Sequence, residues 1–234
     1  MDFTQLIEFD KQLLLLLNGS DSLFLDGMVK TLTTATTWIP LYVALLYLVI
    51  KNNDSFQKVI FIVACALSCV LLAGSLDDVI VKPLVGRWRP THDTDIGILV
   101  DTVNGYRGGR FGFFSAHASN TFSIAMFFVL LVRSRVLSVT LIVWSLINCW
   151  TRLYLGVHFP GDILVGLLWG GIVATTVWYV HSRVSRKMMT DIGAFVSTQY
   201  TSTGYQKTDV DVVVCVFLFT LIYAIFKACF YLMI

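Results

Sequence analysis

Residues 58–80 read KVIFIVACALSCVLLAGSLDDVI, and this stretch decides the class of fold. It is almost entirely apolar and reaches the ~20 residues that a helix needs to cross the hydrocarbon core of a bilayer. Stretches of similar character lie at 31–50, 117–132, 136–155, 161–180 and 212–232. The sequence therefore predicts an all-α, polytopic membrane helix bundle with about six transmembrane helices.

The composition of the 234-residue chain agrees with a membrane protein. Apolar residues of the set AVILMFWYC make up 56%, charged residues only 14%, and the mean hydropathy is +0.76. A soluble domain carries about 25% charged residues. The net charge of +2 excludes a basic nucleic-acid-binding protein, so we expect no nucleic-acid partner. The five cysteines lie in apolar stretches without the spacing of a zinc site or a disulfide framework.

The segments between the spans differ in charge. Short basic connections lie at 51–58, 133–135 and 183–187, and the positive-inside rule places them in the cytoplasm. The opposite set, 81–116 and 156–160, then faces outward. Apolar residues at helical spacing predict an amphipathic interfacial helix near the N-terminus. We expect four parts: an interfacial helix in 1–20, a membrane core at 21–181, a cytoplasmic linker at 182–211 and a C-terminal transmembrane helix at 212–234.

Two outward segments carry unusual polar residues. KPLVGRWRP at 82–90 follows the second span, and taken alone it favours membrane anchoring, because tryptophan is common at interfaces. FFSAH at 113–117 opens the third span. Ser115 is a credible N-cap there, and the exposed N–H groups of a helix N-terminus suit a phosphate. Neither segment is specific by itself.

The third outward segment, TRLYLGVHFPGD at 151–162, points to catalysis. His158 and Asp162 are four residues apart, so the carboxylate can hold one imidazole nitrogen while the other acts as a nucleophile. Charged groups beside apolar spans are costly unless they are paired or used. With the spans in order, all three segments emerge on one side of the membrane and can form one pocket. Asp77 and Asp78 stand apart from the other two segments, so we expect no metal site and no cofactor.

Together the three segments resemble the type 2 phosphatidic acid phosphatases, the PAP2 or lipid phosphate phosphatase superfamily. Its signatures are K-x6-R-P, P-S-G-H and S-R-x5-H-x3-D. This chain has Lys82 to Arg89-Pro90, Ser115-Ala116-His117, and Arg152 to His158 to Asp162 in the same order and spacing, within residues 30–180. Three positions depart from the pattern: Phe114 replaces proline, Ala116 replaces glycine and Thr151 replaces serine. Activity would suffer if position 116 required the positive φ that glycine allows.

The resemblance implies a PAP2-like core plus a C-terminal helix, and a role for each matching residue. His158 would attack phosphorus to form a phosphohistidine, Asp162 would fix its tautomer, and His117 would protonate the leaving lipid oxygen and then activate water. The phosphoryl oxygens would be held by Lys82, Arg89, Ser115, the N–H of Ala116, and Arg152. Three cations would neutralise charge in place of Mg²⁺, so the resemblance implies a metal-independent phosphatase.

The favoured substrates are undecaprenyl pyrophosphate and lipid A phosphate, followed by phosphatidate-type lipids, reached from within a bacterial inner membrane on its extracytoplasmic side. Arg107 and Arg110 in the polar 91–114 loop either contact a headgroup or are merely solvated. A lipid phosphotransferase and a non-catalytic lipid-binding protein remain alternatives. A transporter is disfavoured because the polar residues gather at one boundary rather than at the midplane. The oligomeric state stays open.

Overall fold

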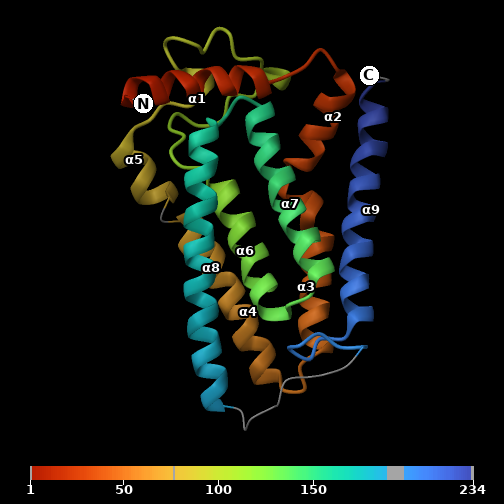
Figure 1. The fold of residues 1–234 in the computed structure, drawn as a ribbon. Helices are drawn as coiled ribbons and strands as arrows, with labels where there is room; N and C mark the ends of the chain where they lie inside the picture. The colour runs from red at the N-terminus through yellow and green to blue at the C-terminus, as the bar shows by residue number, and fades with distance from the viewer. Residues whose placement is uncertain (1, 76, 189–197, 233–234) are drawn as a thin grey trace.

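The computed structural model describes residues 2–75, 77–188 and 198–232, and it is a bundle of helices (Figure 1). Apart from two isolated bridges, the regular structure of these residues is helical, which confirms the predicted class. Four helical segments have the length and apolarity to cross a membrane: Phe56–Val85, Arg135–Tyr154 (α7), Pro160–Arg186 within α8 (Pro160–Met188), and Lys207–Tyr231 (α9). α6 (Ala116–Val132) is shorter, at 17 residues, and covers about 25 Å.

The first span differs from the prediction of 31–50. The chain is helical from Leu23, and α2 (Leu23–Leu32) meets the helical segment Ala35–Lys51, which contains α3 (Ile39–Lys51), at an angle of 67°. Side chains donate to carbonyls at the break: Thr37 Oγ1 donates to Thr31 O at 2.7 Å, in addition to the Thr34 N–H, and Trp38 Nε1 donates to Leu32 O at 2.8 Å. Hydroxyl side chains that satisfy backbone groups locally therefore allow the span to bend.

The second span continues past its predicted end at residue 80. α4 (Phe56–Val70) leads through two π-helical stretches, Leu71–Ser75 and Asp77–Val81, into the short α5 (Lys82–Val85). Gly86, with a φ of +62°, ends α5 in the left-handed conformation that glycine adopts without strain. π-helical turns are often found at functional sites, and these turns carry Asp77 and lead into Lys82.

Close packing of α6 against α8 sets the position of two predicted site residues. A Cβ on Gly166 would lie 2.8 Å from Ser115 O, and one on Gly170 would lie 2.6 Å from Ser119 O. Glycines at these positions let the two backbones approach, as small residues do at helix contacts in membranes. The approach brings Ser115 N within 3.1 Å of Asp162 O, where it donates a hydrogen bond.

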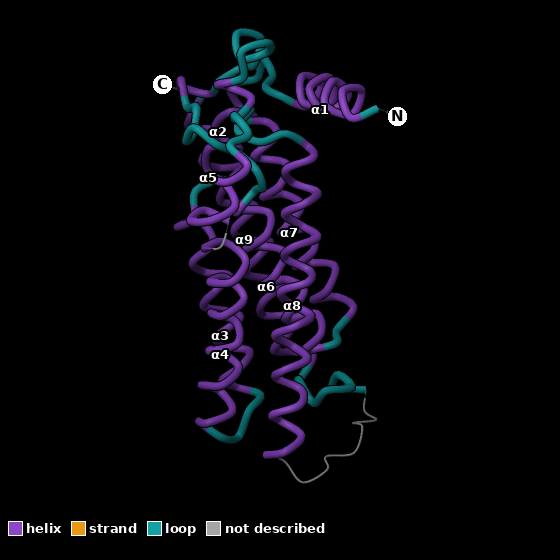
Figure 2. Tube along the Cα trace, turned by 90° about the vertical axis from the view of Figure 1, so that its left-hand side faces the viewer, coloured by secondary structure: helices purple, strands orange, loops and turns teal. Residues whose placement is uncertain are grey.

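The predicted amphipathic helix is present as α1 (Phe3–Leu17), and it lies across one end of the bundle (Figures 1 and 2). Leu14 is buried, whereas Leu6, Phe9 and Leu16 are exposed. The loops between α5 and α6 and between α7 and α8 are at this same end, which we call the α1 end. The first turn of α6 lies deeper in the bundle than the tops of α7 and α8 (Figure 1).

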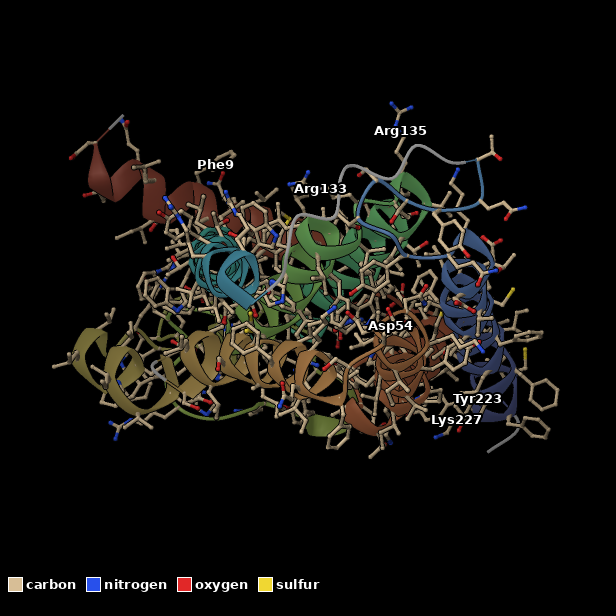
Figure 3. The ribbon with its side chains drawn as sticks, turned by 90° about the horizontal axis from the view of Figure 1, so that it is seen from below. Phe9, Asp54, Arg133, Arg135, Tyr223 and Lys227 are labelled. Carbon is tan, nitrogen blue, oxygen red and sulfur yellow. The ribbon has the colours of Figure 1, made fainter. Side chains whose placement is uncertain are left out.

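The opposite end of the bundle carries the short basic connections, including Arg133 and Arg135 (Figure 3). α8 extends to Met188, beyond the predicted 180, and α9 begins at Lys207, before the predicted 212. Part of the expected linker, 189–197, and the last two residues of the chain lie outside the described residues. The basic connections therefore lie at one end of the bundle and the polar connections at the other.

Candidate active site

Asp77 joins the first two polar segments, which corrects the expectation that it stands apart. Its side chain is fully buried, with Oδ2 at 2.8 Å from Lys82 Nζ, while Oδ1 accepts the Phe114 N–H at 3.1 Å. Lys82 also pairs with Asp78. Asp77, which precedes the first segment, therefore binds both the Lys82 ammonium and the backbone N–H of Phe114, the residue before Ser115.

The second segment forms the helix start that the sequence predicts. Ser115 caps α6, with φ −83° and ψ 107°, and its Oγ accepts the N–H of Ala118 at 3.4 Å. The hydroxyl proton of Ser115 remains available to donate. Ala116 is the first helical residue, with no positive φ, so the replacement of glycine causes no backbone strain. The N–H groups of the first turn have no acceptor within the helix and carry its positive dipole end.

The third segment places His158 beside Asp162. Their Nδ1 and Oδ2 atoms are 3.7 Å apart, which suits an ion pair with an imidazolium but exceeds a hydrogen bond. His158 is 2% exposed, and among the described residues its Nδ1 has no hydrogen-bond partner. The other nitrogen, Nε2, lies 3.4 Å from Arg89 Nη1. The two ring nitrogens therefore face different groups: Asp162 on one side and a cation on the other.

Backbone and hydroxyl groups fix the two arginines of the motif. Arg89 donates from Nε to Phe111 O at 3.1 Å and from Nη1 to Val157 O at 3.3 Å. Arg152, only 3% exposed, donates from Nε to Thr151 Oγ1 at 3.4 Å and from Nη2 to Thr33 O at 3.4 Å. The hydroxyl at position 151 thus supports Arg152, and the Thr33 carbonyl is supplied where the first span breaks.

The electrostatic environment of His158 is strongly positive. Burial, followed by the nearby charges of Arg89, Lys82 and Arg152, holds the pKa of His158 well below its ordinary value of 6.5. The same three cations act on His117 in the first turn of α6, which places both imidazoles in one cluster. His158 is therefore neutral at neutral pH, as a nucleophile must be.

The structure brings together all eight residues that the sequence nominated. Six of them line the cationic cluster directly: Lys82, Arg89, His117, Arg152, His158 and Asp162. Ser115 and Ala116 start the helix that carries His117, and Ser115 is bonded to the backbone of Asp162. Of the two loop arginines, Arg110 stacks on Trp88 at 4.5 Å, whereas the Arg107 carbonyl accepts a hydrogen bond from Thr91.

Sequence reasoning missed three residues that contact this cluster. Arg87 Nη1 donates to Asp162 Oδ1 at 2.7 Å, and Arg87 Nη2 to Asp10 Oδ2 at 2.6 Å. Arg87 stands inside the first segment, but no spacing rule gave it a partner. Tyr106, from the long loop, interacts with Arg152 and Arg89. Asp10 and Tyr106 lie outside the motifs, so no pattern in the sequence pointed to them.

The polar groups of the cluster suit an anion better than a metal ion. In the described part of the chain, no group of three or more His, Cys, Asp or Glu residues is placed to hold a metal. The buried carboxylates Asp77 and Asp162 are each paired with a basic side chain. Cations, a helix N-terminus and a neutral imidazole are groups that suit a phosphate.

Comparison with known proteins agrees with this geometry. The model of the PAP2 superfamily matches residues 57–186. A lipid A 4'-phosphatase of Bacteroides thetaiotaomicron is 38% identical over 187 residues, 80% of this chain and 83% of the relative. A lipid A 4'-phosphatase of Porphyromonas gingivalis is 34% identical over 178 residues, 75% of this chain and 74% of the relative. A lipid A 1-phosphatase of Rhizobium etli is 29% identical over 141 residues, 58% of this chain and 59% of the relative.

No solved structure gives a significant match. The family match covers more than half of the chain and includes all three motif segments, while the two 4'-phosphatases align with most of its length. The chain belongs to the PAP2 superfamily, and it is a multi-pass membrane lipid phosphatase.

Proposed function

We propose that this phosphatase hydrolyses a phosphate of lipid A, at the 4' position, through a phosphohistidine on His158. The observation that carries the chemistry is the buried, neutral imidazole of His158 with three cations around it and Asp162 on its Nδ1 side. The choice of substrate rests on the two 4'-phosphatases to which the chain is similar.

In the first step Nε2 of His158 attacks phosphorus, because Nε2 faces Arg89 whereas Nδ1 faces Asp162. The N–P bond forms as the bond from phosphorus to the sugar oxygen breaks, and His117 gives its proton to that oxygen. The phosphorylated imidazole is positively charged, and Asp162 balances that charge. In the second step His117 takes a proton from water, the water oxygen attacks phosphorus, and inorganic phosphate leaves His158 neutral.

Charge neutralisation falls to Lys82, Arg89 and Arg152 together with Ser115 and the N–H of Ala116. Phosphoryl transfer depends mainly on positioning and on stabilising the charge of the phosphoryl oxygens, and preorganised cations do both. Arg89 and Arg152 are held by carbonyls and a hydroxyl rather than by carboxylates, so their charge remains available to a ligand. We therefore propose that hydrolysis needs no metal ion.

A groove beside the site fits the acyl chains of a lipid. It has a volume of about 770 Å³ and lies between α1 and the bundle. Its lining is mostly apolar and includes Leu6, Leu13, Phe113, Phe159 and Leu164, and Arg87 also belongs to it. Phe159 follows His158 in the chain and Arg87 is bonded to Asp162, so we assign the acyl chains to this groove and the phosphate to the neighbouring cluster. The volume lies within the range of ligand pockets.

The charge distribution gives the orientation that we propose. Basic connections lie at one end of the bundle and the candidate site at the other. On the positive-inside rule we propose that the site faces the extracytoplasmic side, and we propose a bacterial inner membrane as the location. Lipid A in the outer leaflet of that membrane would present its phosphates at this level.

The test is phosphate release by the purified protein in detergent, with EDTA present, from lipid A, undecaprenyl pyrophosphate and phosphatidate. We expect release from lipid A, no loss of activity with EDTA, and no new phospholipid when alcohols are added. His158→Ala should abolish release, whereas His181→Ala, a buried histidine towards the opposite end of the bundle, should retain it. Activity in His158→Ala protein, or its loss with EDTA, contradicts the mechanism. Phosphate release from one of the other lipids and not from lipid A would contradict the proposed substrate but not the mechanism.

A further inference from the structure

One guanidinium links the N-terminal helix to the acid of the candidate catalytic pair. Arg87 donates from Nη2 to Asp10 Oδ2 at 2.6 Å and from Nη1 to Asp162 Oδ1 at 2.7 Å. Asp10 belongs to α1, which lies across the α1 end of the bundle (Figure 1), outside the residues that the superfamily model matches. Two consecutive ion pairs, Asp10–Arg87 and Arg87–Asp162, therefore connect α1 to the carboxylate beside His158.

Asp162 divides its two oxygens between different partners. Oδ1 receives Arg87, while Oδ2 accepts the Phe159 N–H at 3.0 Å and faces Nδ1 of His158 at 3.7 Å. The bond to Phe159, the residue before α8, is the reciprocal bond that an acidic residue makes in the first turn of a helix. The position of Oδ2 beside the imidazole thus depends on Arg87 staying on Oδ1.

A guanidinium free to choose its geometry prefers to bind both oxygens of one carboxylate as a fork. Arg87 cannot do this to Asp162, because Asp10 holds its second nitrogen. Asp10 is itself held, since its Oδ1 accepts the Gly161 N–H at 2.7 Å in the first turn of α8. Asp162 is fully buried and Arg87 largely buried, so solvent competes little for these bonds.

We propose that Asp10 and Arg87 are positioning residues for the phosphatase reaction, an inference that rests on the proposed roles of His158 and Asp162. Asp10 restricts Arg87 to a single bond with Asp162, and this leaves Oδ2 to orient His158 and to balance its charge when it is phosphorylated. The N-terminal helix thereby becomes part of the catalytic apparatus. Loss of the Asp10 charge lets Arg87 turn onto both oxygens of Asp162.

A second ion pair on α1 provides a matched control. Lys11, the neighbour of Asp10, binds Asp95 Oδ2 at 2.5 Å and Asp93 Oδ1 at 3.5 Å. This pair ties α1 to the long loop but has no bond to Asp162 or His158. Lys11→Met therefore weakens the attachment of α1 without altering the hydrogen bonds of the acid–histidine pair.

The experiment compares kcat, KM and the unfolding temperature of the full chain in detergent, with lipid A as substrate, for Asp10→Asn and Lys11→Met. Asn keeps an acceptor for the Gly161 N–H but lacks the charge that holds Arg87. We expect Asp10→Asn to lower kcat about tenfold with KM nearly unchanged, because the cations that bind phosphate are intact. Lys11→Met should change kcat less than twofold at a similar unfolding temperature.

The Arg87→Lys background provides a further check, because a lysine cannot form the fork. In that background Asp10→Asn should lower kcat less than about twofold. Such non-additivity is expected only if both residues act through Asp162. Equal losses of kcat in Asp10→Asn and Lys11→Met protein, full activity of Asp10→Asn protein, or additive effects in the Arg87→Lys background would each overturn the inference. An active His158→Ala protein would instead overturn the proposed function itself.

Discussion

In the mechanism that we propose, His158 must be neutral to attack phosphorus, yet it must carry a phosphoryl group in a site that attracts anions. Cations around a buried imidazole reconcile these demands. Arg89, Lys82 and Arg152 disfavour its protonation, and the same charges stabilise the transferred phosphoryl oxygens. Asp162 lies on the remaining side of the ring and compensates the positive charge that appears when Nε2 is phosphorylated.

The pH dependence of kcat/KM follows from the lowered pKa of His158. The imidazole is competent to attack only when deprotonated, so the acid limb should lie below 6.5, the ordinary pKa of histidine. Folding should respond in the same direction: the unfolded chain binds the proton more tightly, so stability declines as pH falls through 6.5.

Removing a neighbouring cation should raise the pKa of His158. Arg89→Gln should therefore move the acid limb to higher pH while lowering kcat/KM about hundredfold. Lys58→Gln, at the opposite end of the bundle, should leave both unchanged. A pH–rate profile of the three proteins checks this, and an acid limb that is unmoved by Arg89→Gln would contradict the assignment of His158.

That the candidate site residues come together could be predicted from the sequence, but much of their support could not. Short-range spacing links His158 to Asp162 and makes Ser115 an N-cap, and both relations are present. Arg87 gained its partners only through folding, since Asp10 is 77 positions away. Likewise Asp77 meets Phe114 across 37 positions. No local pattern encodes such pairs.

At the scale of the elements, helix breaks supply contacts to the candidate site. Hydrophobic runs predicted the order of the apolar helices, because apolar length decides whether a helix can cross a bilayer. Of the six predicted spans, four have that length in the described residues, the first is a bent pair and α6 is shorter. The hydrophobic runs did not reveal the 67° bend of the first span, since threonine is compatible with a helix as well as with a break. At that bend the Thr33 carbonyl accepts a hydrogen bond from Arg152. The second π-helical stretch begins at Asp77, which forms an ion pair with Lys82.

The contact of α6 with α8 should tolerate no added methyl group at Gly166. A Cβ there would lie 2.8 Å from Ser115 O and would push apart the two helices that carry His117 and Asp162. Gly166→Ala should lower kcat/KM at least about tenfold, since small misplacements of catalytic groups cost large factors in rate. Gly171→Ala, whose Cβ would lie 3.4 Å from Phe122, should keep full activity. Phosphate-release kinetics of the two variants test this prediction. Equal activities of Gly166→Ala and Gly171→Ala protein would contradict the packing argument.

At the scale of the whole molecule, the candidate site and the groove lie at one end of the bundle, where we propose that a lipid phosphate binds. α1 lies beside this end (Figure 2). Residues of α1 and of the bundle together line the groove that we assign to acyl chains. Composition and charge alternation predicted the two ends, because both depend on contact with the bilayer. The groove could not be predicted, since it exists only where α1 packs beside α8.

Filling the groove should weaken binding of the lipid but not of its phosphate group. Leu164 lines the groove, whereas Leu168, one turn further along α8, faces a separate shallow hollow. Leu164→Trp should raise KM for lipid A about tenfold and leave KM for deacylated lipid A unchanged. Leu168→Trp should leave both unchanged. Steady-state kinetics with both substrates would contradict the groove assignment if the two tryptophan variants behaved alike.

The central claim is that segments distant in sequence form one site in which His158 carries the phosphoryl group. It is tested most directly by quenching the enzyme in alkali during turnover of labelled lipid A and mapping the phosphorylated residue by mass spectrometry. The account predicts the label on His158 of the wild-type protein and its absence from His158→Ala protein. Recovery of the label on any other residue, or equal labelling of both proteins, would contradict it.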